Sequence, residues 1–160
     1  QLTWKEQKIL IYDADSLKLK KIVHFPAEGW GLCADGENVW MSDGSSFLFQ
    51  RAYPSFELKK KLQVKVQGKS IERLNALAYA KGAIYANVWG QEQILQINPR
   101  TGAVTGILDA SSLLKPAEKT KLSLDEVLNG IAFREENGTF LITGKNWPYL
   151  FELKVVHDVE

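Results

Sequence analysis

A block of about 45 residues recurs along this chain, and no other feature of the sequence constrains the fold as strongly. Each copy begins with a small residue and an apolar pair, passes through a turn, and continues as a strand of apolar and aromatic residues. The three copies span residues 31–41, 76–86 and 130–141. Leu32 and Leu77 hold the same place in the first two copies and are 45 positions apart. This spacing is typical of a β-propeller, in which each four-stranded blade takes about 40–45 residues.

A second hairpin follows the repeated block and completes the pattern of a blade. The clearest example is the pair of apolar strands at 94–97 and 103–107, which flank a turn containing Asn98-Pro99 and Thr101-Gly102. Such pairs form turns between alternating strands. Equivalent hairpins are expected at 9–19 and 47–58. The sequence therefore predicts an all-β chain, a β-propeller built of four-stranded antiparallel blades.

The third copy of the block lies further along than the period requires, because a polar segment is inserted at 109–127. Leu77 and Ile131 are 54 positions apart. We expect two single turns of helix near this insertion, at 111–115 and 123–128. The second has Ser123 followed three residues later by Glu126, the arrangement of a capping box. Both turns are expected to lie on a surface loop.

The number of blades follows from the length of the chain. At about 45 residues a blade, the 160 residues provide roughly three and a half blades, whereas a closed propeller has at least four. We therefore expect a partial propeller domain over residues 1–160. A missing N-terminal region, proteolysis, or completion of the ring by other polypeptide would each explain it. An open ring would expose unpaired strand edges, which natural proteins avoid.

Composition limits the classes of partner and cofactor. The chain is 45% hydrophobic and 24% charged, with a formal net charge of +1, which gives no basic surface for nucleic acid. No apolar run approaches the ~18 residues of a membrane span. Cys33 is the one cysteine, and His24 and His157 are far apart in the sequence. No set of ligands has metal-site spacing, so we predict no metal and no other cofactor. From the charge and the short apolar runs we predict no nucleic-acid partner and no membrane span.

Polar and aromatic residues recur at equivalent places beside the inner strands of successive blades. Three of them fall just before a first inner strand: Trp30, Asn75 and Asn129. Another three fall just after an inner strand: Trp4, Trp89 and Lys145. Both places border the loops at one axial mouth of a propeller, where ligands commonly bind. The sequence therefore predicts that these six residues form one site.

Each of these residue types also has a purely structural interpretation, which stays open at this point. A tryptophan in a blade is often part of the core. Trp40, in the middle of a strand, is assigned to the core, and Trp147 is expected to pack on an edge. An asparagine at a strand start is often a turn former, and a lysine after Thr143-Gly144 is often only solvated.

Seven short strings, in register along most of the chain, resemble one known family. They are QLTW (1–4), GWGL (29–32), WMSDGS (40–45), ANVW (86–89), INPRTG (97–102), VLNGIA (127–132) and TGKNWP (143–148). In this order they resemble the plant- and bacterial-type glutaminyl-peptide cyclotransferases, or glutamine cyclotransferases. The match runs from Gln1 to about Leu153.

The resemblance implies a five-bladed propeller, of which one to two blades precede Gln1. It also implies an enzyme that converts the N-terminal glutamine of peptides or proteins to pyroglutamate with release of ammonia, without zinc or another cofactor. It implies that Trp4, Trp30 and Trp89 line the substrate cage. Asn75 and Asn129 would offer amide groups to the substrate. Lys145 would stand by the carbonyl or the leaving group, as electrostatic stabiliser or proton carrier. The implied protein is an exported monomer, either periplasmic or secreted.

The sequence departs from the family at two places. The family's acid/base glutamate lies in a Gly-Glu-Gly motif upstream of the segment that matches Trp4, and these 160 residues contain no such motif. Glu28 belongs to a different blade and is assigned no more than a contact at the rim. Ala76 and Ala78 stand where the family usually has two glutamates, which removes acidic groups from the inner strand.

A second functional hypothesis stays beside the enzyme. A propeller of this lineage could bind a peptide N-terminus or another small ligand at the axial mouth without turnover. A third is a structural propeller repeat in a larger assembly, for which Lys145 would be dispensable.

Overall fold

Short antiparallel strands make up most of the computed structural model, which describes residues 1–156. Two sheets have four strands each. They are β3 (Gly31–Ala34), β4 (Asn38–Ser42), β5 (Phe47–Ala52) and β6 (Leu58–Gln63), and β9 (Leu74–Ala80), β10 (Ala83–Val88), β11 (Gln93–Ile97) and β12 (Val104–Asp109). A three-stranded sheet contains β13 (Leu128–Arg134), β14 (Thr139–Gly144) and β15 (Phe151–Leu153). The remaining strands form two hairpins, β1 (Lys8–Tyr12) with β2 (Leu19–His24) and β7 (Lys65–Val66) with β8 (Lys69–Ser70).

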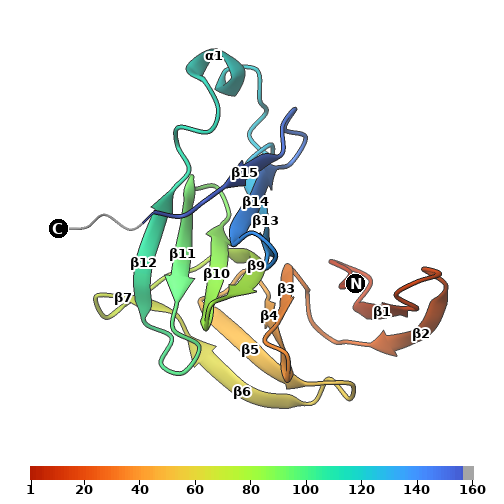
Figure 1. Ribbon diagram of the computed structural model, residues 1–160. Helices are drawn as coiled ribbons and strands as arrows, with labels where there is room; N and C mark the ends of the chain where they lie inside the picture. Colours follow the sequence, from red (N-terminus) through yellow and green to blue (C-terminus); the bar gives the residue numbers. More distant parts are fainter. Residues whose placement is uncertain (157–160) are drawn as a thin grey trace.

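The predicted all-β propeller class is confirmed. Within each of the larger sheets, neighbours in the sequence are neighbours in the sheet, and every pair is antiparallel. Figure 1 shows the sheets placed around a common centre, with β3, β9 and β13 as their inner strands. Two four-stranded blades, one three-stranded sheet and the β1–β2 hairpin correspond to the roughly three and a half blades expected from the length.

The hairpin turns explain why the strands reverse where they do. Lys81 and Gly82, between β9 and β10, both have positive φ, at 49° and 80°. This is the requirement of the two-residue turn whose twist matches a hairpin. Between β3 and β4, the Asp35 carboxylate accepts hydrogen bonds from the backbone N–H groups of Glu37 and Asn38, at 3.0 and 2.7 Å. The strands β10 and β4 therefore each start at a defined residue.

The inner strands of neighbouring blades are joined by hydrogen bonds as well as by packing. Ser42 Oγ, at the end of β4, donates to the backbone carbonyl of Asn75 in β9 at 2.7 Å. The Ala76 N–H donates to Asn129 Oδ1 at 3.3 Å, and the Gly130 N–H donates to Asn87 Oδ1 at 3.3 Å. These contacts connect β4, β9, β10 and β13 around the centre, so they fix the relative positions of the blades.

The core lies between the faces of adjacent sheets. One cluster, around Trp40, Leu48, Leu74 and Ile97, fills the space between the β3–β6 and β9–β12 sheets. A second joins the β9–β12 sheet to the β13–β15 sheet, and a third lies between β1 and the β3–β6 sheet. Trp40 is 1% exposed and donates its indole N–H to Asp35 Oδ2 at 2.8 Å. The expectation that Trp40 belongs to the core is confirmed.

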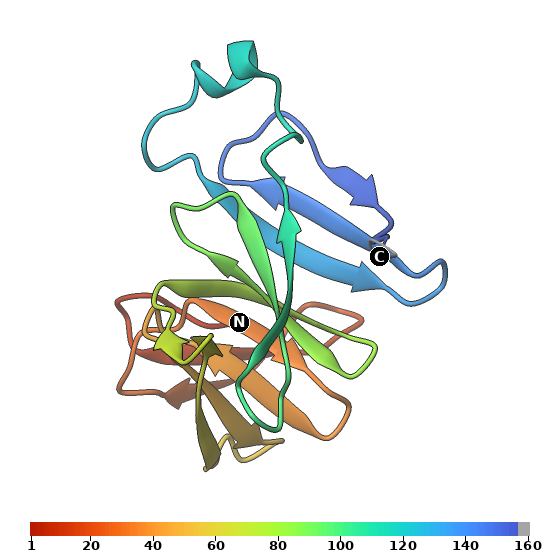
Figure 2. The same cartoon turned by 90° about the vertical axis from the view of Figure 1, so that its left-hand side faces the viewer.

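The expected helical turns at 111–115 and 123–128 are wrong. The one described helix is α1 (Pro116–Lys119), which lies between them, and Figure 2 shows it projecting beyond the sheets at one end of the molecule. Proline disfavours a helical residue before it, and Lys115 is extended, with φ −68° and ψ 151°. Pro116 instead opens a helix, where its missing N–H costs nothing. Ser123 and Glu126 form only a turn, in which the Ser123 N–H donates to Glu126 Oε2 at 2.6 Å.

Candidate active site

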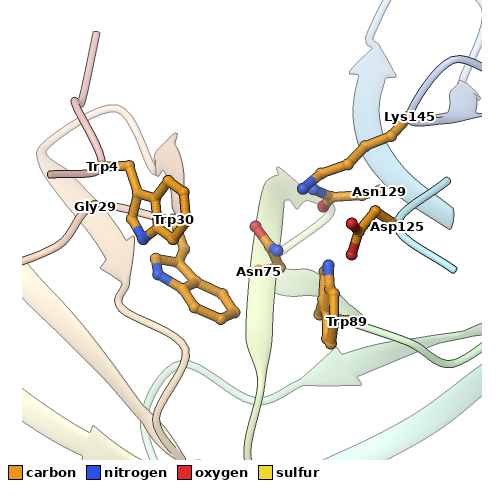
Figure 3. Close-up of a pocket in the computed structure, with 8 residues that line it drawn as sticks. All are labelled: Trp4, Gly29, Trp30, Asn75, Trp89, Asp125, Asn129 and Lys145. Carbon is orange, nitrogen blue, oxygen red and sulfur yellow. The ribbon is translucent and has the colours of Figure 1, made fainter. Parts of the chain in front are cut away.

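A pocket of about 680 Å³ opens where the N-terminal segment meets the ends of the inner strands. Its volume lies within the range of small-molecule sites. Figure 3 shows Trp4 and Trp30 on one side, Asn75 in the middle, and Trp89, Asp125, Asn129 and Lys145 on the other. All six residues that the sequence places at one mouth line this pocket, together with Gly29 and Asp125.

The fold delivers these residues from four separate parts of the chain. Trp4 comes from the segment before β1, and Trp30 from the residue before β3. Asn75 and Asn129 are each the second residue of an inner strand, β9 and β13, one step inside the strand rather than before it. Trp89 directly follows β10 and Lys145 directly follows β14. Trp4 and Lys145 are 141 positions apart in the sequence. They share one pocket because the blades are arranged around a centre.

One carboxylate oxygen connects the two indoles of the first side. The Trp4 and Trp30 Nε1–H groups both donate to Glu28 Oε2, at 2.8 and 3.0 Å. These hydrogen bonds, that of Trp30 first and then that of Trp4, hold the pKa of the Glu28 carboxyl below its ordinary value. The Trp30 ring also packs against Gly44, where a Cβ would stand 2.8 Å from the ring. Glu28 was expected to make no more than a rim contact, and the structure gives it this bridging position instead.

Trp89 forms part of the opposite wall and is held by Arg73. The backbone N–H of Trp89 donates to the Arg73 carbonyl at 2.9 Å. The Arg73 guanidinium carbon lies 5.6 Å from the centroid of the Trp89 ring, within cation–π range. Arg73 therefore contacts both the backbone and the ring of Trp89 at the end of β10.

The two asparagines differ in what they can offer a ligand. Asn75 is buried, and its side-chain amide has no hydrogen-bond partner among residues 1–156, so both its donors and its acceptor are available. Asn129 uses its Oδ1 to accept from the Ala76 N–H. Asn129 still has both Nδ2 donors and the second lone pair of Oδ1. Asn75 can therefore offer a ligand all of its donors and acceptors, whereas Asn129 offers both donors and one remaining acceptor position.

Lys145 brings a positive charge to the pocket. Its backbone N–H donates to the Val127 carbonyl at 3.0 Å, which fixes the start of its loop. Figure 3 shows the side chain reaching toward Asn129, and within the described part of the chain its ammonium group forms no ion pair. An ammonium group without a partner is free to act on a ligand.

Asp125 is a pocket residue that sequence reasoning missed. It lies in the loop between α1 and β13, which was expected to form a helical turn. Trp147 holds this loop in place, since its indole N–H donates to the Glu126 carbonyl at 2.9 Å. Trp147 was expected on an edge, and it packs edge-to-face on Phe151 of the outer strand β15. A carboxylate two residues before the VLNGIA string was the signal that could have drawn attention to Asp125.

Comparison with known proteins identifies the family of this chain. The family model described as glutamine cyclotransferase matches residues 1–155. The chain belongs to the glutamine cyclotransferase family. A glutaminyl-peptide cyclotransferase of Arabidopsis thaliana is 33% identical over 156 residues, covering 97% of this chain and 49% of the relative. The chain thus spans about half the length of that curated relative.

Solved structures support the fold as well as the family. The crystal structure of Myxococcus xanthus glutaminyl cyclase is similar with a TM-score of 0.89 and 38% identity, over 95% of this chain and 66% of that one. A chain of the mitotic checkpoint complex is similar with a TM-score of 0.54 at 13% identity, a likeness of fold alone.

Residues 1–156 provide neither a cluster of metal ligands nor a membrane-crossing helix. No group of three or more histidine, cysteine, aspartate or glutamate side chains in this range could hold a metal ion. In the same range, no helix combines the length and the apolar character that a membrane crossing requires.

Proposed function

We propose that this chain carries the substrate pocket of a glutaminyl-peptide cyclotransferase, which closes the N-terminal glutamine of a peptide or protein to pyroglutamate. The observation that supports this proposal is the pocket itself. Three indoles, two amides and one ammonium group, drawn from the N-terminal segment and from three sheets, line a single cavity. Membership of the family points to the same reaction.

The reaction joins two ends of one residue. The α-amine attacks the γ-carboxamide carbon, so a new C–N bond closes a five-membered ring. The bond from that carbon to the amide nitrogen breaks, and the nitrogen leaves as ammonia after it gains a proton. The proton lost by the amine balances the one gained by the leaving group, so no oxidant or co-reactant is needed.

The first task of the pocket is to hold the glutamine side chain curled over its own amine. Trp4, Trp30 and Trp89 would enclose the aliphatic part of the side chain. Because the amine and the carboxamide already belong to one residue, the pocket restricts bond rotations rather than bringing two molecules together, and fixing a glutamine side chain is worth about 1.5–2 kcal/mol. Aromatic walls also exclude water from the reacting carbon.

The second task is to stabilise charge on the γ-carboxamide oxygen as the amine attacks. The Asn129 Nδ2 donors and the Lys145 ammonium lie on the same side of the pocket, where they can serve as an oxyanion site. Asn75, with both donors and acceptor available, would hold the carboxamide or the α-amine. Donors aimed at developing charge are each worth about 10²–10³ in rate.

The third task is proton transfer from the amine to the leaving nitrogen, which needs an acid/base group. An α-amine with a pKa near 7.7–8.0 is already partly neutral at pH 7, so a strong base is unnecessary. The family resemblance assigns this step to a glutamate in a Gly-Glu-Gly motif, which these 160 residues do not contain. We propose no other residue for it.

We also propose that the protein acts outside the cytoplasm, on exported peptides or proteins that begin with glutamine. The support for this location is the family resemblance. The substrate class follows from the reaction, because only a free N-terminal glutamine has both the amine and the carboxamide that the ring requires.

A peptide assay tests the proposed activity. The protein expressed from its complete natural reading frame is incubated with a Gln-initiated peptide, and ammonia release and the loss of one ammonia from the peptide mass are followed. An N-acetylated version of the same peptide is the control, because its blocked nitrogen cannot attack. We expect ammonia from the free peptide alone. Binding of the peptide without ammonia release, under conditions in which a known cyclase works, would favour a non-catalytic binding module instead.

A further inference from the structure

The wall of the pocket formed by Trp4 and Trp30 depends on one residue that does not line the pocket. Glu28 Oε2 accepts both indole N–H groups, at 2.8 and 3.0 Å. An indole N–H is only a donor, and a carboxylate is the stronger class of acceptor. The two tryptophans are thus joined through a single charged atom, although they come from segments 26 positions apart.

Backbone contacts bring Trp4 within reach of Glu28. The Gly29 N–H donates to the Thr3 carbonyl at 3.3 Å, so the N-terminal segment runs beside the residue after Glu28. A Cβ on Gly29 would stand 2.5 Å from Leu2 Cβ, so only glycine permits this approach. The juxtaposition of Trp4 and Glu28 is therefore built into the backbone.

The two indoles need this bridge to different degrees. Trp30 is half-buried, and its ring rests on Gly44. Trp4 is 55% exposed, and the Lys5 ammonium lies 4.3 Å from the centroid of its ring. A half-exposed indole with one flexible lysine beside it has many rotamers available, and each χ angle it fixes costs entropy. The hydrogen bond to Glu28 is the contact that selects one of them.

We propose that Glu28 is a positioning residue, which holds Trp4 and Trp30 as one rigid wall against the glutamine side chain. The inference rests on the proposed function for its kinetic consequence, but not for its structural one. Glu28 acts through the indoles, since it is absent from the residues that line the pocket. The wall sets the curl of the substrate, so loosening it lowers kcat more than it raises KM.

The test uses two substitutions in the protein expressed from its complete reading frame. Glu28→Ala removes the acceptor, whereas Glu28→Gln keeps an oxygen at the same reach. Glu6→Ala is the matched control, because Glu6 is an exposed carboxylate of the same N-terminal segment without a bond to an indole. The indole Nε1–H signals in ¹H–¹⁵N spectra, assigned with Trp4→Phe and Trp30→Phe, report the bridge directly. Kinetics with a Gln-initiated peptide report its effect.

We expect Glu28→Ala to move both indole signals upfield and to lower kcat by about tenfold to a hundredfold, the range for a misplaced positioning group. Glu28→Gln is expected to keep the indole signals and kcat close to the wild-type values, and Glu6→Ala to change neither the signals nor kcat. Unmoved indole signals in Glu28→Ala would overturn the proposal, whatever the kinetics. So would moved signals with unchanged kcat and KM. If the wild-type protein cyclises no Gln-initiated peptide, the proposed function fails, while the indole signals still decide whether Glu28 holds the wall.

Discussion

Lys145 is the residue at which the proposed catalytic role can be tested apart from folding. It is exposed at the end of β14, and no described residue pairs with its ammonium group. Lys145→Ala is therefore expected to leave the free energy of unfolding within about 0.5 kcal/mol of the wild type, as for an ordinary surface substitution. If the lysine stabilises the oxyanion or the leaving group, kcat falls by about 10²–10³.

The measurement for Lys145 is steady-state ammonia release with a Gln-initiated peptide. Lys69→Ala is the control, because Lys69 is an exposed lysine in the β7–β8 hairpin. Unchanged kcat in Lys145→Ala would show that Lys145 has no part in the mechanism. The lysine would then be only a solvated surface residue, the structural interpretation that the sequence left open.

Asp125 is expected to act on substrate binding rather than on the chemical step. Its carboxylate lines the pocket on the side of Lys145, where it can attract the protonated form of the substrate's α-amine. Because the group is exposed, the pair is worth about 0.2–1 kcal/mol. We expect Asp125→Asn to raise KM by about two- to fivefold, and less at high salt, where exposed charges are screened. KM measured at low and high salt checks this, with Asp15→Asn in the β1–β2 turn as control.

At the scale of single residues, the sequence predicted the composition of the pocket but not its internal contacts. Trp4 and Lys145 could be grouped with the other four because each residue holds an equivalent place beside an inner strand. The bridge through Glu28 could not be predicted in this way, since it depends on Leu2 packing over Gly29, a contact between segments without a shared period. Asp125 was missed because its loop was interpreted as helix.

At the scale of elements, the contact between β3 and β9 is the tightest backbone approach that borders the site. A Cβ on Gly31 would stand 1.9 Å from the Asn75 carbonyl oxygen and 2.9 Å from Ser42 Oγ. The Asn75 carbonyl is backbone and cannot rotate away, so the strands must separate. We expect Gly31→Ala to destabilise by about 1–3 kcal/mol or more, and to weaken substrate binding because Asn75 moves with its carbonyl.

Chemical unfolding and peptide kinetics together test the Gly31 prediction. Ala34→Ser, at the exposed end of the same strand, is the control and is expected to change stability by no more than about 0.5 kcal/mol. A Gly31→Ala protein with wild-type stability would show that β3 and β9 tolerate a wider separation than their packing implies.

Strands were easier to predict than the helix for a physical reason. Blade strands are short, alternate in polarity and are bounded by turn residues such as Asn98 and Gly102, so their signal is local. The inserted segment has no such alternation. Its one helix is fixed by Pro116 at the start and by Glu118, whose Oε2 accepts from the Lys115 N–H at 2.8 Å. A four-residue helix carries too little periodicity to be located from pattern alone.

At the scale of the whole molecule, the site exists only when the blades are assembled. Trp30 precedes β3, Asn75 lies in β9 and Asn129 lies in β13, and no one blade holds enough of these groups to enclose a ligand. Loss of the contacts between blades is therefore expected to abolish binding before the individual hairpins melt. A probe in a strand between blades would report that opening directly.

Cys33 is such a probe, because it is the one cysteine in the sequence and lies in β3 against the first core cluster. Burial, with a smaller effect of the Asp35 charge, raises the pKa of its thiol to about 12. At pH 8 only roughly one thiol in ten thousand is then ionised, and the thiolate is the reactive form. Because folding raises the pKa of this thiol, its contribution to stability is fully present below the unfolded pKa of 9.0. That contribution is lost as the pH rises through the folded pKa of about 12.

We therefore expect Cys33 to resist maleimide at pH 8 in the folded protein and to react at the rate of global unfolding as denaturant is added. The Cys33→Ser, Ala34→Cys double variant moves the thiol one position along the strand to an exposed side chain and is expected to react at once. A Cys33 thiol that reacts as fast as that control, in protein that still shows native far-UV dichroism, would mean that β3 separates from its neighbours without global unfolding. Since Trp30 precedes this strand, such local opening would also break the pocket, and activity would then fall in parallel with thiol labelling.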